Sequence, residues 1–354
     1  MKKLSLALIL TMVVAMASGC GSQKSAGSPN KKPESKELVV STWGLNQDQY
    51  EKNVIEPFEK ANNVKITLEV GNNDERLAKL KNNPDSTVDV MYLAESYSQQ
   101  AIDQGLFQKL DYSKIPNSKK VLSAAQKFVK AGYGPAYTLN RAAIVYDPSK
   151  VSGKITSWKD LWKSDFKGKI AIPDMSTTFG PAMVYAAANE ASKSVKSDNG
   201  ESAFKALEQL KPNVVKTYTK SSDLVNMFTS GEITTAVAAD YVVGSIKKAM
   251  PNAVFVNPEE GAYLNFNTIN ITKNSKHKDL AYKFINYVLS ADVESKTAGT
   301  VGDAPINTDV KLSGDEAANL TYGSSINGSK SLDYKFINKN ISSWMDKWNR
   351  LFNK

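Results

Sequence analysis

Two patterns of apolar and polar residues alternate along most of the chain. Short apolar runs, or strict alternation of apolar and polar positions, predict strands, whereas apolar positions spaced three and four residues apart predict helices. Strands are predicted at residues 38–42, 64–70, 88–93, 142–146, 169–172, 214–218, 234–238 and 263–271. Helices are predicted at residues 49–61, after the capping residues 73–75, and at 180–191, 202–210, 222–228, 242–249, 280–289 and 341–352. Such a succession is typical of an α/β protein, in which helices cover a sheet.

The first residues break this pattern and resemble a bacterial lipoprotein signal. Lys2 and Lys3 precede an apolar run at 4–15, which is too short to span a bilayer comfortably, and Ala-Ser-Gly-Cys follows at 17–20. We therefore expect residues 1–19 to be a signal peptide that is removed, and Cys20 to be lipidated. The alternative is an ordinary secretory peptide followed by a cysteine. Residues 20–37 are rich in Ser, Gly, Lys and Pro and predict a flexible linker.

The composition limits the kinds of site and partner that the rest of the chain can have. Cys20 is the only cysteine of the sequence, so disulfides, thiolate metal sites and cysteine nucleophiles are excluded from the rest of the protein. The formal net charge is +9, but part of it belongs to the signal and the linker, where it favours an anionic membrane surface. The mildly basic body gives no reason to expect nucleic acid as a partner. The 354 residues exceed the size of one ordinary core, so two domains are expected.

Three segments have a distinctive sequence: Gly-Leu-Phe-Gln-Lys-Leu-Asp-Tyr-Ser-Lys-Ile-Pro-Asn at 105–117, Ser-Trp-Lys-Asp-Leu-Trp at 157–162 and Phe-Lys-Gly-Lys-Ile-Ala-Ile-Pro-Asp at 166–174. They resemble the extracytoplasmic solute-binding proteins of ABC importers, in the branch that includes spermidine/putrescine-binding proteins and, further away, thiamine- and ferric-ion-binding proteins. Residues 260–264 and the closing Trp344, Trp348 and Arg350 look closer to the thiamine-binding branch.

The resemblance implies a two-lobed periplasmic-binding-protein-like fold of type II, with a ligand cleft between the lobes. The first lobe is expected to comprise residues 38–138 and 261–354, and the second residues 139–260. The strands that cross between the lobes are then expected near residues 138–140 and 258–261.

Polyamine recognition in this family implies aromatic faces along the alkyl chain and carboxylates for the ammonium groups. This sequence keeps the first aromatic residue, Trp43, but has Asn46 nearby where the family pattern has an acid. In the second crossing strand, Asn265 and Asn267 replace a tryptophan and an aspartate, and Thr177 and Thr178, with Ser176, replace further acids. Hydroxyls at a helix start can instead form a modest anion site or cap the helix.

Other side chains supply charge and aromatic surface. Glu95 lies beside Tyr97, and Asp240 beside Tyr241; each acid is a candidate amine acceptor. The alternatives are a solvated loop acid for Glu95 and a helix cap for Asp240. Arg141 resembles an anion clamp of ferric-binding relatives, although a surface salt bridge explains it nearly as well. Tyr263 completes the stacking faces expected from Trp43, Tyr97 and Tyr241, unless these rings belong to the core. The ligand-binding set is therefore Trp43, Asn46, Glu95, Tyr97, Arg141, Thr177, Thr178, Asp240, Tyr241, Tyr263, Asn265 and Asn267.

An enzyme is the competing class. His277, the only histidine, lies in a polar turn between lysines, and the sequence has no Gly-x-Ser-x-Gly motif, phosphate loop or metal-ligand spacing. We therefore expect no catalysis, metal or cofactor. The predicted function is capture of a small amine-bearing solute by a monomeric, extracytoplasmic lipoprotein, anchored through Cys20, which delivers it to an ABC permease and ATPase. Alternatives are a thiamine-like, zwitterionic or anion-containing ligand, a secreted hydrolase, or a surface sensor without a permease.

Overall fold

A computed structural model describes residues 36–44, 46–318 and 320–353. The predicted signal, Cys20 and most of the predicted linker lie outside these residues. Within the described part of the chain, no helix is both long enough and apolar enough to cross a membrane.

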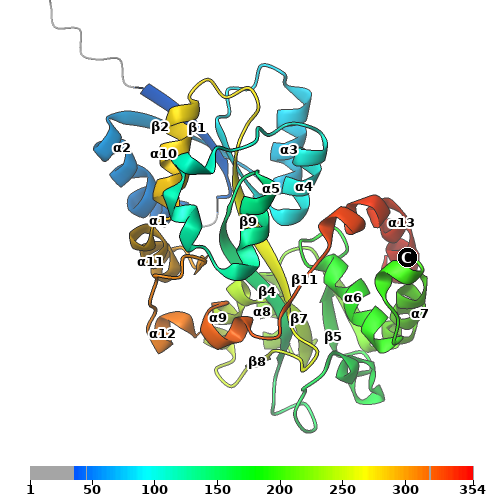
Figure 1. Cartoon of the computed structure of the whole chain (residues 1–354). Coiled ribbons are helices and arrows are strands. Elements are labelled where there is room, and N and C mark those ends of the chain that lie inside the picture. The colour runs from blue at the N-terminus through cyan, green and yellow to red at the C-terminus, as the bar shows by residue number, and fades with distance from the viewer. Residues whose placement is uncertain (1–35, 45, 319, 354) are drawn as a thin grey trace, which may run out of the picture. The chain divides into compact units, whose positions relative to one another are not determined.

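The strands of the described residues join in a single mixed sheet (Figure 1). Along the sheet they run in the order β2 (Val64–Val70), β1 (Lys36–Thr42), β3 (Val90–Ala94), β9 (Tyr263–Ile271), β4 (Ala136–Tyr146), β7 (Thr235–Ala239), β5 (Ile170–Pro173) and β6 (Val214–Tyr218). β1, β2 and β3 are parallel, as are β7, β5 and β6, whereas β9 and β4 pair antiparallel with their neighbours. Three short strands, β8 (Val254–Val256), β10 (Ala304–Pro305) and β11 (Lys330–Ser331), join β4 or β9.

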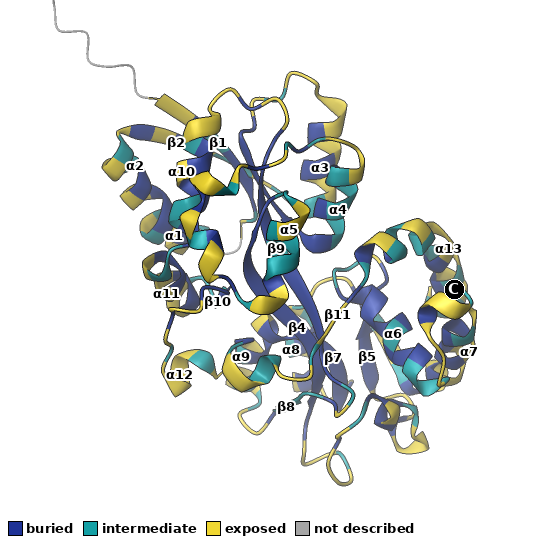
Figure 2. Ribbon diagram, viewed as in Figure 1, coloured by how far each residue is buried: buried dark blue, intermediate teal, exposed yellow. Residues whose placement is uncertain are grey.

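Most helices bury one face against the sheet or a neighbouring helix (Figure 2). The helices are α1 (Gln47–Tyr50), α2 (Glu56–Asn62), α3 (Asn73–Asn82), α4 (Glu95–Asp103), α5 (Gln126–Ala131), α6 (Gly180–Glu190), α7 (Glu201–Leu210), α8 (Asp223–Thr229), α9 (Asp240–Ala249), α10 (Lys278–Val288), α11 (Ala291–Thr300), α12 (Gly314–Ala317) and α13 (Tyr334–Phe352). Two short ones, α5 and α12, have no fully buried residue. A π-helical turn at Glu51–Ile55 joins α1 and α2.

The long strands β4 and β9 connect two separate large hydrophobic cores. In β4, Leu139 belongs to the core that holds Leu38, whereas Ala142 belongs to the core that holds Trp158. In β9 the same change occurs between Tyr263 and Leu264. The partners of β4 change at the same place, from β9 before residue 142 to β7 and β8 after it. This arrangement is the α/β two-lobed fold expected from the sequence.

The last helix, α13, packs on the second core. Trp344 and Trp348 are fully buried there, and the Trp348 Nε1 donates to Asp174 Oδ2 at 3.0 Å. The Trp344 Nε1 donates to the Asn199 carbonyl oxygen at 2.8 Å. This packing differs from the expectation that all of residues 261–354 belong to the first lobe.

Most predicted elements are present within a few residues of their expected bounds, but β4 and α13 begin six and seven residues early, and α4, α5 and α11 were not predicted. β4 begins at Ala136, six residues before the predicted strand, because its first half contains polar residues that pair with β9. α4 was not predicted, since the positions it buries are Glu95, Ser98 and Ala101, which give no apolar periodicity.

Candidate functional site

The carboxyl ends of β1 and β3 bring Trp43 and Glu95 to the same edge of the sheet. β1 and β3 are parallel neighbours, with Val40 opposite Val90, and Trp43 and Glu95 follow their last residues. Loops and helix starts at this edge are where open α/β sheets bind ligands.

Glu95 is a buried carboxylate with one unused oxygen. It is the first residue of α4 and is only 8% exposed. Its Oε1 accepts a hydrogen bond from Lys127 Nζ at 2.6 Å, while its Oε2 is buried without a partner among the described residues. Burial raises the pKa of Glu95, and the Lys127 ammonium offsets this only in part. Glu95 is therefore not the solvated loop acid that was the alternative expectation.

A row of asparagines crosses β9 and β4 beside Glu95. The Asn265 Nδ2 donates to Asn267 Oδ1, and the Asn267 Nδ2 donates to Asn140 Oδ1, both at 3.1 Å. The Asn265 Oδ1 is buried and has no partner among the described residues. Ala94 pairs with Asn267, so the register continued by one residue sets Glu95, the first residue of α4, opposite Phe266, which lies between the two asparagines in the sequence. Asn265 and Asn267, both predicted from the sequence, are thus in hydrogen-bond contact with each other.

Trp43 belongs to an aromatic cluster with Tyr50, Tyr92 and Tyr137. The Tyr92 ring lies 6.3 Å from Trp43, 6.1 Å from Tyr50 and 4.7 Å from Tyr137 between ring centroids, each pair edge to face. The guanidinium of Arg76 lies 5.1 Å from the Trp43 ring centroid. Trp43 is half-buried, so it presents part of its ring to solvent.

Arg76 is held by the backbone around this cluster. Its Nε donates to the Gly71 carbonyl oxygen at 2.9 Å, and its Nη1 donates to the Tyr92 carbonyl oxygen at 2.7 Å. Its Nη2 is buried without a partner among the described residues. Burial lowers the pKa of Arg76 to about 10, so the guanidinium is charged at neutral pH.

Arg141 and Asp240 meet through Thr321. The Arg141 Nη1 donates to Thr321 Oγ1 at 3.2 Å, and the same hydroxyl donates to Asp240 Oδ2. Arg141 also donates from Nε to Asn257 Oδ1 at 2.9 Å and from Nη1 to the Leu320 carbonyl oxygen at 3.0 Å. The guanidinium is thus held by groups of the protein, and the alternative of a surface salt bridge does not fit its burial.

Asp240 is only 1% exposed. Burial raises its pKa to about 6, against the opposing effects of the Thr321 hydroxyl and of Arg141. Asp240 is the first residue of α9, and its Oδ1 accepts from the Tyr241 backbone N–H at 2.9 Å. Its contacts are therefore those of a buried structural acid.

The other predicted residues form no side-chain hydrogen bond with Glu95 or the asparagine row in the described structure. Tyr263 is 2% exposed, packs against Trp158 and accepts from Asn189 at its hydroxyl, so it supports the core. Tyr241 is 48% exposed and its hydroxyl lies 3.3 Å from Ser221 Oγ. Tyr97 is half-buried in α4.

The remaining predicted residues form hydrogen bonds with the backbone. The Thr177 Oγ1 donates to the Asp174 carbonyl oxygen in the loop before α6. The Thr178 carbonyl oxygen accepts from the Tyr334 hydroxyl, and the Asn46 Nδ2 donates to the Val301 carbonyl oxygen.

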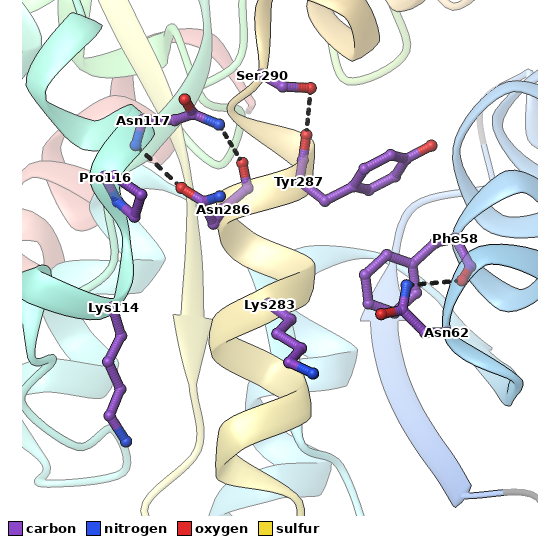
Figure 3. Close-up of a pocket in the computed structure, with 9 residues that line it drawn as sticks. All are labelled: Phe58, Asn62, Lys114, Pro116, Asn117, Lys283, Asn286, Tyr287 and Ser290. Carbon is purple, nitrogen blue, oxygen red and sulfur yellow. Dashed lines mark hydrogen bonds between the residues drawn. The ribbon is translucent and has the colours of Figure 1, made fainter.

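Two surface cavities lie away from all of these residues. The first lies between α10, the end of α2 and the segment around Pro116, where Asn117 and Asn286 are joined by two hydrogen bonds (Figure 3). The second is lined by lysines and by Ile155 and Thr234 in the second lobe. No group of three or more metal-ligating side chains occurs in the part of the chain that the structure describes.

The structure adds residues that the sequence reasoning missed, chiefly Arg76, Lys127 and Tyr137. Arg76 could have been found, because it lies four residues before Leu80 on the apolar face of α3, where a charge is unexpected. Lys127 and Tyr137 carry no such signal, since only the tertiary fold brings them to the site.

Solved structures with this fold define the class of protein. An ABC transporter protein from Clostridium perfringens is 58% identical, with a TM-score of 0.85 over 89% of this chain and 100% of that one. A putative extracellular solute-binding protein from Bordetella parapertussis is 24% identical, with a TM-score of 0.76 over 89% of this chain and 98% of the other. The fold is therefore that of the solute-binding proteins.

The chain belongs to the family of bacterial extracellular solute-binding proteins, whose model matches residues 53–321. It is a substrate-binding protein of an ABC transporter. The spermidine/putrescine-binding periplasmic protein of Escherichia coli is 26% identical over 254 residues, which cover 70% of this chain and 72% of that protein. The putrescine-binding periplasmic protein of the same organism is 28% identical over 283 residues, or 73% and 75% of the two chains.

Proposed function

We propose that this substrate-binding protein captures a small amine-bearing solute beside Glu95 and delivers it to a membrane permease for import. The observation that carries the proposal is the buried Glu95 carboxylate, whose Oε2 has no partner among the described residues and which begins α4 next to the row of Asn140, Asn265 and Asn267. Unpaired buried acceptors cost free energy, and a ligand that donates hydrogen bonds relieves that cost. An ammonium group is the donor that best matches a carboxylate and an amide oxygen.

Capture in this fold depends on contacts to both lobes. We infer that the first lobe comprises residues 38–139 and 264–320 and the second residues 142–263 and 332–352, which follows the division of the two cores. β4 and β9 are then the crossing strands, and the asparagine row lies where they pair. A ligand selects the closed form only through contacts that both lobes make at once.

The relatives named for spermidine and putrescine support an amine over other solutes. The alternative ligand carries an anionic group as well, as a zwitterion does. Arg76 favours this alternative, because its Nη2 is buried without an acceptor among the described residues. The contacts of Arg141 give less support, since protein acceptors already occupy its Nε and Nη1.

A membrane anchor would keep the protein close to its permease. Lipidation of Cys20 would provide the anchor, and the linker at 20–37 the freedom to reach a permease. The anchor is tested by comparing membrane and soluble fractions of bacteria that express the protein or its Cys20→Ala variant. We expect the variant to leave the membrane fraction, and equal partition of the two proteins contradicts anchoring.

A thermal-shift screen tests the ligand class. The purified protein is heated with spermidine, putrescine, thiamine and its phosphates, amino acids, phosphonates and ferric citrate, because a bound ligand raises the melting temperature by mass action. We expect a shift with amines and a smaller one in Glu95→Gln. A shift with anions alone contradicts the proposal.

A further inference from the structure

The side chain of Lys127 has the surroundings that an organic ammonium ligand needs. Its Nζ donates to Glu95 Oε1 at 2.6 Å and lies 4.8 Å from the ring centroid of Phe128 and 5.1 Å from that of Phe266. The two rings pack edge to face, with their centroids 5.4 Å apart. A carboxylate and aromatic faces around one cation are the contacts by which proteins bind amines. The protein therefore already holds an ammonium group at Glu95, and that group is its own.

The position of Lys127 allows this ammonium to leave Glu95. Lys127 belongs to α5, which has no fully buried residue, and its side chain is far more exposed than that of Glu95. Within the described residues, Glu95 is the only acid that pairs with Lys127. A lysine stem is flexible and regains rotamer freedom when its ammonium is released into water. A competing cation can therefore displace Lys127 without any movement of the backbone.

The ion pair reduces the free energy that a ligand gains at Glu95. A buried carboxylate without a cation is costly, so Lys127 compensates the charge of Glu95 while no ligand is bound. An arriving ammonium replaces this contact, and its net gain is the difference between two ammonium contacts rather than the whole of one. A ligand must therefore bring contacts beyond its ammonium group, which disfavours simple cations that have none.

We propose that Lys127 is a built-in competitor of the ligand, whose ammonium occupies the amine subsite at Glu95 until the ligand displaces it. The inference rests on the proposed function, because it takes Glu95 as the amine acceptor. A purely structural ion pair differs from a competitor in the sign of its effect. Removing a structural partner of Glu95 weakens ligand binding, whereas removing a competitor strengthens it.

Titration calorimetry with putrescine and spermidine on Lys127→Met tests this sign. Methionine keeps an apolar stem over Phe128 and Phe266 and removes the ammonium. We expect the variant to bind the amines about tenfold more tightly, the scale of a charge-assisted hydrogen bond that the ligand no longer has to replace. Lys130→Met is the matched control, because Lys130 is an exposed residue of the same helix and its loss changes the net charge equally.

Lys127→Arg separates displacement from charge repulsion at a distance. Arginine keeps the positive charge but can hold the Glu95 carboxylate with two parallel hydrogen bonds. A competitor that is held more firmly should weaken amine binding about threefold or more, the scale of one additional hydrogen bond. Repulsion alone predicts no change, because the charge is the same, so an unchanged affinity in this variant overturns displacement.

The outcomes separate the inference from the proposed function. If Glu95→Gln weakens amine binding while Lys127→Met binds no more tightly than Lys130→Met, the competitor is overturned and the amine function stands. Weaker binding by Lys127→Met overturns it as well, because Lys127 then positions Glu95 for the ligand. If neither the unmodified protein nor Lys127→Met binds an amine, both proposals fall together.

Discussion

Lys127 Nζ donates to Glu95 Oε1 at 2.6 Å and leaves Glu95 Oε2 without a partner in the described structure. The pair is asymmetric, because the Lys127 side chain is 38% exposed and that of Glu95 only 11%. Lys127 can therefore move into solvent, whereas Glu95 stays in place. An incoming ammonium can thus bind the free oxygen, or take the place of Lys127, without the carboxylate having to move.

Glu95→Gln should weaken amine binding about tenfold or more, since the amide keeps the shape but loses the charge. Titration calorimetry measures the change. Asp103→Asn is a matched control at the exposed end of the same helix, where Gln99 is the partner. Equal losses in the two variants would remove Glu95 from the ligand site.

Arg141→Lys should destabilise the protein by about 2 kcal/mol, because a lysine cannot reproduce the forked bonds to Asn257 and Leu320. Denaturant unfolding measures this as a lower midpoint at unchanged slope. Arg350→Lys, on the exposed face of α13, should have little effect. If Arg141→Lys unfolds normally but loses an anionic ligand, Arg141 is an anion clamp as the family resemblance implies.

The free energy of unfolding should rise as the pH falls from 8 to 6. Burial raises the pKa values of Glu95, Asp240, Glu294 and Asp303, with Asp240 at about 6 and Asp303 at about 7. A raised pKa means that the folded state binds protons that the unfolded state does not, so acidification stabilises the fold by up to about 1.4 kcal/mol per pH unit for each titrating group.

Melting temperatures at pH 8, 7 and 6 check this prediction. Asp240→Asn should make the melting temperature less dependent on pH, whereas Asp309→Asn, at an exposed position, should leave this pH dependence unchanged. The acids whose pKa values are lowered, such as Asp174 and Asp333, act in the opposite direction, but only below about pH 4, where they take up protons. A melting temperature that falls steadily from pH 8 to 6 contradicts the prediction.

Trp348→Ala should cost about 3–5 kcal/mol of stability, because it opens a cavity in the second core and removes the donor to Asp174. Thermal unfolding measures the loss. Lys339→Ala, at an exposed position of the same helix, serves as control. If the two variants melt alike, α13 does not stabilise the second core.

The sequence predicts the elements of the sheet well, because strands such as β9 and helices such as α10 follow the periodicity of their apolar residues. It does not predict α4, where a buried acid, a serine and an alanine replace the apolar face. Nor does it predict the contact between α13 and the second core, which joins residues more than one hundred positions apart, as in the bond from Trp344 to Asn199.

In the candidate site, too, some residues could be predicted from the sequence, whereas their tertiary partners could not. Trp43 and Glu95 could be predicted, because each follows a strand that ends at the same edge. The partner that decides the role of Glu95 could not, since Lys127 reaches it from another helix. Tyr263 looked equally suitable in the sequence, and only its packing against Trp158 assigns it to the core.

The position of α13 also bears on how the chain folds. The second core draws its residues from positions 142–263 and from 332–352, so a ribosome must make the whole intervening segment before Trp344 and Trp348 can reach their places. Until then this lobe exposes the apolar surface that α13 later covers. Such a core is complete only when synthesis is nearly finished, and until then its exposed apolar surface can form non-native contacts.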